Sequence, residues 1–232
     1  MGKHTEIELK ARVPRWRDCR RRLTELAGGG SSLVKDDGYW FPAAAPGASG
    51  LRVRREHTGG EGQTAEHTLV TYKTKERREG IEINDEHEFE VSDGAVFEEL
   101  LERLGLEKRI AKHKTGWVWR YGGINAELVK VSGGAKVGGA EAGGTKVGGA
   151  GFDGGTGGPE PPDSAGTKDL GWFLELEILS GPGGSDEAVA AARGRLLELL
   201  AQAGIGEADL ESRYYSELLA GGVSRDGVFK SP

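Results

Sequence analysis

The chain has 232 residues, among them 40 glycines, and a formal net charge of −6. This acidic balance and the lack of a long basic run argue against non-specific nucleic-acid binding. No apolar run approaches the roughly 20 residues that cross a bilayer, and the single cysteine, Cys19, cannot form an internal disulfide. We therefore expect a soluble, cytoplasmic protein that has neither a nucleic acid nor a membrane as its partner.

The first part of the chain alternates strand-like segments with two amphipathic helices. Residues 5–13 alternate apolar and polar side chains, as a half-buried strand does. Pro14 and the glycines at 28–30 bound a predicted helix over 15–27, and apolar side chains at i, i+3 and i+4 spacing predict another over 94–104. Further strands are predicted over residues 32–41, 50–56, 67–76 and 80–91.

The second part of the chain predicts a β-hairpin, an insertion, a last strand and two helices. We expect one domain over residues 1–221, followed by a flexible tail over 222–232. The predicted strands cover residues 110–121, 124–131 and 169–181, and the helices cover 185–203 and part of 211–220.

A glycine-rich repeat separates the hairpin from the last strand. From Gly133 the chain runs "GGAKVGGAEAGGTKVGGAGF", in units of five residues that each begin with a glycine pair. Five is neither a strand nor a helix period, and glycine pairs maximise the entropy cost of ordering. We therefore predict that residues 133–168 form a disordered, flexible insertion within the domain. A phosphate-binding glycine loop is the alternative, but such loops are short and usually end in Lys-Ser or Lys-Thr.

Charged side chains spaced by two recur on one face of nearly every predicted strand. Any antiparallel sheet with one wet side shows such alternation, so a single pair means little. The signs, however, sort by strand, and like charges repel across a ladder unless a ligand of opposite sign lies between them. The acidic groups are Glu6 with Glu8, Glu88 with Glu90, and Glu175 with Glu177, and the basic groups are Arg52 with Arg54, Lys73 with Lys75, and Lys112 with Lys114.

These faces suit the inside of a closed barrel. A barrel of about eight strands has an interior wide enough for side chains or a small ligand. Arg and Lys there would contact phosphoryl oxygens, while carboxylates would hold Mg²⁺ or Mn²⁺ ions that bridge the same oxygens. We therefore predict an α+β fold, in which a closed antiparallel eight-stranded β-barrel with a charged interior is flanked by α-helices.

The order of the charged strands resembles that of the CYTH superfamily, the triphosphate tunnel metalloenzymes. "EIELK" matches the ExExK signature of that family, and "GLRVRRE", "LVTYKTK", "EHEFEV", "IAKHKTGW" and "LGWFLELEIL" follow in the family's order. "ESRYYSELL" is similar to the SYxxLL ending found in the class IV adenylyl cyclase branch. The resemblance covers residues 5–131 and 169–219.

The resemblance implies a role for each charged strand. Lys114 departs from the family, which usually has Arg there, so bidentate contact is lost although the charge survives. Glu127 stands where the family commonly has Asp, and His87 inherits no role and is expected at the surface. The catalytic residues implied are Glu6, Glu8 and Lys10; the metal ligands are Glu6, Glu8, Glu175 and Glu177, with help from Glu88 and Glu90; and the phosphate contacts are Lys10, Arg52, Arg54, Lys73, Lys112 and Lys114.

The activity implied is metal-dependent processing of a nucleoside triphosphate or another linear triphosphate. We favour a class IV adenylyl cyclase, which converts ATP to cyclic AMP and pyrophosphate, because the strand motifs and the "SRYYSELL" ending fit that branch best. A thiamine triphosphatase or an inorganic tripolyphosphatase is the alternative. A non-catalytic binder of nucleotides or polyphosphate is disfavoured, since an anion binder needs no paired metal carboxylates. A homodimer is left open.

Overall fold

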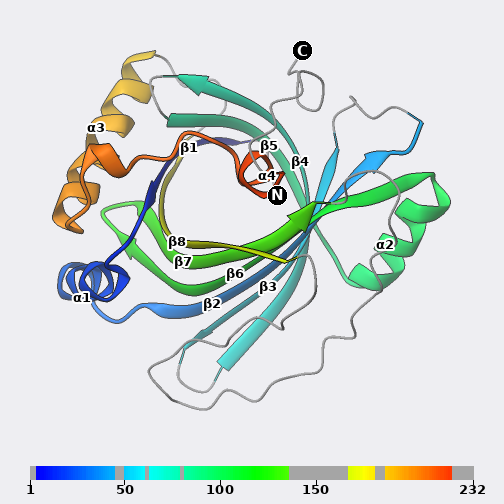
Figure 1. Ribbon diagram of the computed structural model, residues 1–232, viewed down its shortest axis with the longest axis horizontal. Helices are drawn as coiled ribbons and strands as arrows, with labels where there is room; N and C mark the ends of the chain where they lie inside the picture. The colour runs from blue at the N-terminus through cyan, green and yellow to red at the C-terminus, as the bar shows by residue number, and fades with distance from the viewer. Residues whose placement is uncertain are drawn as a thin grey trace.

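The computed structural model describes residues 4–44, 50–60, 63–78, 81–135, 167–180 and 186–220. The strands in this part of the chain are β1 (His4–Arg12), β2 (Ser31–Pro42), β3 (Leu51–Gly60), β4 (Gln63–Arg78), β5 (Ile81–Val91), β6 (Leu106–Tyr121), β7 (Ile124–Ala135) and β8 (Lys168–Ser180). All neighbouring strands are antiparallel, and they form a closed barrel in the order β1-β5-β4-β3-β2-β6-β7-β8 (Figure 1). The predicted barrel is therefore confirmed.

The helices flank the barrel, except for the last one. They are α1 (Trp16–Ala27), α2 (Gly94–Arg103), α3 (Asp186–Gln202), the 3-10 turn η1 (Glu207–Asp209) and α4 (Tyr215–Leu219). Figure 1 places α1 and α3 outside the barrel on one side and α2 on the other, whereas α4 lies within the ring of strands. None of the helices in the described residues is long and apolar enough to cross a membrane.

The main apolar core lies outside the barrel wall, beneath α1 and α3. Ile7 and Leu9 of β1 are each 1% exposed and belong to one cluster with Leu23 of α1 and with Leu196 and Leu200 of α3. Successive side chains of a strand point to opposite faces. The charged side chains that alternate with this apolar set therefore point into the barrel.

A smaller apolar cluster fills part of the interior. Inward-facing Leu33, Val129 and Phe173 pack there with Tyr215 and Leu218 of α4. These contacts, together with a hydrogen bond of 2.6 Å from Lys168 Nζ to the carbonyl oxygen of Leu218, hold α4 inside the barrel. The short helix thus lies against the charged side chains of the same strands.

Several strands extend beyond their predicted ends. β6 begins at Leu106 rather than at residue 110, and β7 continues to Ala135. The first three residues of the predicted insertion therefore belong to a strand, where Gly133 fits because a Cβ there would lie 2.3 Å from the carbonyl oxygen of Ala111. Its last residue, Lys168, opens β8. Residues 136–166 and the predicted tail, 222–232, lie outside the described residues.

Candidate functional site

Carboxylates from β1, β7 and β8 gather in the barrel interior. The strand register pairs Glu8 with Glu177, and Glu6 lies two residues along the same face of β1. Burial, followed by the negative charges of Glu6 and Glu127, raises the pKa of Glu177 well above its ordinary value. Asn84 of β5 donates from Nδ2 to Glu6 Oε2 at 2.9 Å, and its buried Oδ1 accepts no hydrogen bond from the described residues. Crowded carboxylates and an unused oxygen suit a hard cation such as Mg²⁺.

Glu175, two residues from Glu177 on the same face of β8, has a different environment. Lys114 Nζ donates to Glu175 Oε2, and the hydroxyl of Tyr215 donates to Glu175 Oε1. Burial by itself would raise the pKa of Glu175, but the positive charges of Lys114 and Lys112 lower it to about 2. Glu175 is therefore ionised and neutralised by lysine, whereas Glu177 is crowded by other carboxylates.

The basic strands supply buried cations to the same interior. Asp37 of β2 accepts hydrogen bonds from Arg54 Nε at 2.7 Å and Arg54 Nη2 at 3.1 Å, and Lys112 Nζ lies 2.9 Å from its Oδ2. Burial opposes ionisation, but Arg54 and Lys112 hold the pKa of Asp37 well below its ordinary range. Lys10 Nζ similarly lies 3.1 Å from Glu82 Oε1. Each of these cations is thus held by a buried carboxylate.

Three of the predicted phosphate-binding lysines surround one aromatic ring. The Nζ atoms of Lys10, Lys112 and Lys114 lie 4.7, 4.9 and 5.2 Å from the centre of the Tyr215 ring. Such contacts stabilise an ammonium group over the face of the ring. Phe173 supports the ring edge-on, with its centroid 5.1 Å away. Tyr215 therefore links the lysines to Glu175.

The predicted acidic pair of β5 lies farther from this cluster. Glu88 Oε2 accepts hydrogen bonds from Thr71 Oγ1 at 2.8 Å and Arg52 Nη2 at 3.3 Å, and its side chain is 26% exposed. Glu90 is 45% exposed and lies 2.7 Å from His67 Nδ1. Glu90 is therefore a surface residue in this structure, and its predicted role as a metal ligand stays a prediction.

Two further residues named in the sequence analysis, Lys73 and His87, lie away from the described cluster or have no described side chain. Lys73 pairs with Glu86 in the register of β4 and β5, but its side chain lies outside the described part of the structure, so its phosphate contact is untested. His87 is exposed, as expected, and lies 4.0 Å from Asp85. The structure brings together in the interior Glu6, Glu8, Lys10, Arg52, Arg54, Lys112, Lys114, Glu175 and Glu177.

The sequence prediction missed several interior residues. Lys35 and Asp37 alternate on β2 like the other charged pairs, so the same spacing could have revealed them. Lys35 Nζ lies 2.6 Å from Glu127 Oε1, which also establishes that Glu127 reaches the interior. On β5 the residues at the centre are Glu82, Asn84 and Glu86 instead of Glu88 and Glu90, because the register pairs Glu82 with Glu8.

A metal ion is compatible with this donor set. As the side chains stand in the described residues, no group of three Asp, Glu, His or Cys side chains converges closely enough to hold one. Several carboxylates are instead turned toward lysine and arginine, as Glu82 is toward Lys10. The crowded carboxylate of Glu177 and the Oδ1 of Asn84, which has no hydrogen-bond partner among the described residues, nevertheless leave oxygen donors available, and oxygen is the ligand that Mg²⁺ and Mn²⁺ prefer.

The comparison with protein families identifies the chain. The sequence model of the CYTH domain matches residues 4–215, so the chain belongs to the CYTH family. Enzymes of this family act on triphosphates within the barrel and use divalent metal ions. A search of curated proteins finds no match.

Solved structures show the same fold at low sequence identity. A protein from Pyrococcus horikoshii is 20% identical, with a TM-score of 0.63, and the match covers 94% of this chain and 99% of that one. A candidate adenylate cyclase from Vibrio parahaemolyticus is 18% identical, with a TM-score of 0.59 and coverage of 95% and 100%. A candidate adenylyl cyclase from Hippeastrum, described as having a dominant triphosphatase activity, is 14% identical, with a TM-score of 0.52 and coverage of 94% and 96%.

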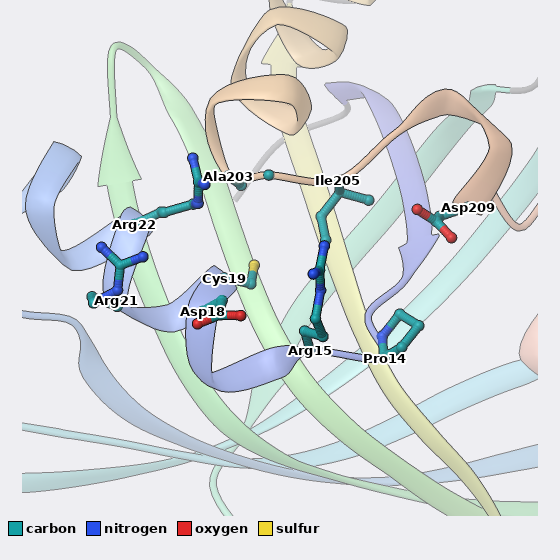
Figure 2. A pocket seen from close by; sticks show the side chains of 10 residues that line it. Pro14, Arg15, Asp18, Cys19, Arg21, Arg22, Ala203, Ile205 and Asp209 are labelled. Carbon is teal, nitrogen blue, oxygen red and sulfur yellow. The ribbon is translucent and has the colours of Figure 1, made fainter.

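A separate pocket of about 310 Å³ lies outside the barrel. Figure 2 shows it between α1 and the connection that follows α3. It contains none of the predicted site residues. Its lining includes Arg15, Asp18, Cys19, Arg22, Ile205 and Asp209.

Proposed function

We propose that this chain is a metal-dependent enzyme that processes linear triphosphates inside its barrel, and that its reaction is that of a class IV adenylyl cyclase. One observation carries the proposal: the crowded carboxylates around Glu177 and the buried cations Arg54 and Lys112 share one closed interior. An anion binder needs only the cations. Carboxylates and cationic side chains in the same interior fit a complex of a metal ion with a chain of phosphates.

The triphosphate would replace the internal partners of the buried cations. Arg54 already makes a forked contact with the two oxygens of Asp37, and the same geometry suits two phosphoryl oxygens. Lys10 and Lys114, now paired with Glu82 and Glu175, would act as point charges. Because an unpaired buried charge is costly, the cations are held in place until phosphate arrives.

The carboxylate cluster would hold Mg²⁺ or Mn²⁺. Glu6, Glu8 and Glu177 are the proposed ligands, and Asn84 Oδ1 is a further oxygen donor beside Glu6. When bound, the ion would neutralise phosphate charge and polarise the attacked phosphoryl group. Glu177, whose pKa is raised, would release its proton as the ion enters.

In the cyclase reaction, the ribose 3′-oxygen would pass its proton to solvent water as it bonds to the α-phosphorus. The bond from the α-phosphorus to the bridging oxygen breaks, and pyrophosphate leaves. The buried lysines and Arg54 would stabilise the charge that develops on pyrophosphate. The strand motifs, the "SRYYSELL" ending and the likeness in fold to the Vibrio parahaemolyticus protein support this reaction.

A triphosphatase is the second candidate. Water would then attack a terminal phosphorus of thiamine triphosphate or tripolyphosphate. The bond from that phosphorus to the bridging oxygen would break, so that orthophosphate and either thiamine diphosphate or pyrophosphate leave. The same side chains would serve this reaction. The likeness in fold to the Hippeastrum protein supports it.

A panel of substrates tests these proposals. The protein would be incubated with Mg²⁺ or Mn²⁺ and with ATP, thiamine triphosphate or tripolyphosphate, and the products followed by phosphorus NMR. We expect cyclic AMP and pyrophosphate from ATP, whereas orthophosphate from any substrate would assign a triphosphatase. Binding of all three substrates without turnover would contradict both.

Removal of one proposed metal ligand tests the site within the same assay. We expect Glu8→Gln to reduce turnover about 100-fold or more, because the carboxylate charge is lost while the side-chain volume is kept. Glu99→Gln is the matched control, since Glu99 is exposed and forms an ion pair with Arg103, one turn along α2. Near-normal turnover by Glu8→Gln would refute the metal assignment.

A further inference from the structure

The segment that leads into α4 is fastened to β1. Leu210 forms an isolated bridge with Ala11, and the N–H of Glu211 donates to the carbonyl oxygen of Lys10 at 2.8 Å. Lys10 points its own side chain into the interior, where its Nζ lies 3.1 Å from Glu82. The attachment point of the segment is therefore the backbone of a proposed phosphate-binding residue.

The carboxylate of Glu211 is the centre of this attachment. Its Oε2 accepts from Arg12 Nε at 3.0 Å and Arg12 Nη2 at 2.8 Å, and Arg213 donates to both of its oxygens at 2.7 and 2.8 Å. The Glu211 side chain is only 7% exposed. The hydrogen bonds of Arg213, opposed by burial and helped by those of Arg12, lower the pKa of Glu211 to about 2. Arg12 also lies over the ring of Phe173, 5.0 Å from its centre.

The helix that follows this segment, α4, is too short to be stable by itself. α4 has five residues, and the capping contact of its first turn is the hydrogen bond of 2.5 Å from the N–H of Tyr214 to Glu217 Oε2. Helices of this length are not stable without tertiary contacts. Its first residue, Tyr215, nevertheless sits among Lys10, Lys112 and Lys114 and donates to Glu175.

We propose that Glu211 is a positioning residue, which acts through Arg12 to place Tyr215 among the phosphate-binding lysines. This inference rests on the function proposed above. The side-chain contacts of Glu211 are with Arg12 and Arg213 and not with the proposed phosphate-binding lysines, so its proposed role is indirect. Its role is to fix the backbone four residues before Tyr215, so that the ring supports the three lysines and the hydroxyl reaches Glu175.

A double-mutant cycle between Glu211 and Tyr215 tests the proposal by activity. We expect Glu211→Gln to lower kcat/KM about 10- to 100-fold, the scale of a small misplacement of a catalytic group. In a Tyr215→Ala background the same substitution should lower it less than about 2-fold, because the group that Glu211 positions is gone. Equal losses in both backgrounds would overturn the proposal, since they indicate general destabilisation. Glu99→Gln is the matched control and should equal wild type.

A second measurement separates this inference from the proposed function. Protein labelled with ¹³C at the tyrosine ζ carbons would give one signal per tyrosine, and Tyr215→Phe assigns the signal of interest. We expect Glu211→Gln to shift the Tyr215 signal and Glu99→Gln to leave it unchanged. An unmoved signal in Glu211→Gln would overturn the positioning role. A shifted signal in a protein that turns over no triphosphate would support the positioning and refute the proposed function.

Discussion

At the scale of single residues, two buried carboxylates in the interior have opposite environments. Asp37 is fully buried but lies between Arg54 and Lys112, which hold its pKa low. Glu177 faces Glu6 and other carboxylates, which together with burial hold its pKa high. The ionised form of Asp37 therefore stabilises the fold through its ion pairs. The ionised form of Glu177 is unfavourable unless a cation binds it, and otherwise Glu177 retains its proton. This difference separates a supporting residue from a proposed metal ligand.

Replacing each carboxylate by its amide should therefore change stability in opposite directions. The pKa of Glu177 in the fold is raised above the ordinary 4.5, so wild type loses stability as the pH rises from that value toward the raised one. Without metal, we expect Glu177→Gln to gain stability over wild type between about pH 5 and about pH 8. Asp37→Asn should lose about 3–5 kcal/mol, because two buried cations lose their partner. Urea unfolding at both pH values measures this, and losses of equal size in both variants would contradict the assignment.

At the scale of elements, the alternation of charge along the strands predicted which faces point inward, and this is why most of the site could be found. The register between strands could not be predicted in the same way. The sequence of β5 offers inward-facing carboxylates along its whole length, and only the pairing of Glu82 with Glu8 decides that its first half faces the site. Tyr215 was also missed, because nothing in a five-residue helix indicates that it packs inside a barrel.

The close approach of β6 and β7 depends on a glycine. A Cβ at Gly116 would lie 2.0 Å from the carbonyl oxygen of Leu128. We expect Gly116→Ala to cost about 1–3 kcal/mol, since the strands must separate. Gly194→Ala in α3 is the control: a Cβ there has no neighbour within 4 Å, so the variant should gain about 0.5–1 kcal/mol. Thermal unfolding compares them, and a Gly116→Ala variant as stable as wild type would disprove the packing argument.

At the scale of the whole molecule, the charged side chains of the site lie inside the barrel and the main apolar core lies outside its wall. The outer faces of β1 and β8 are covered by α1 and α3 and form the main core, so stability does not require an apolar interior. The interior can instead hold buried ions whose partners are other side chains, such as Lys35 with Glu127. Because the barrel is closed, inward-facing side chains from strands far apart in the sequence meet in one interior. A single site can therefore be built from several strands. The periodicity of each strand indicated such a closed interior, but not which cation pairs with which carboxylate.

A crystal structure of the protein with tripolyphosphate and Mn²⁺ tests the central claim most directly. We expect the phosphate chain inside the barrel, in contact with Lys10, Arg54 and Lys112, and Mn²⁺ on the carboxylates of Glu6, Glu8 and Glu177. The anomalous signal of manganese would locate the ion without reference to the phosphate. Phosphate bound only outside the barrel, for example in the pocket beside α1, with the interior ion pairs unchanged, would contradict the account.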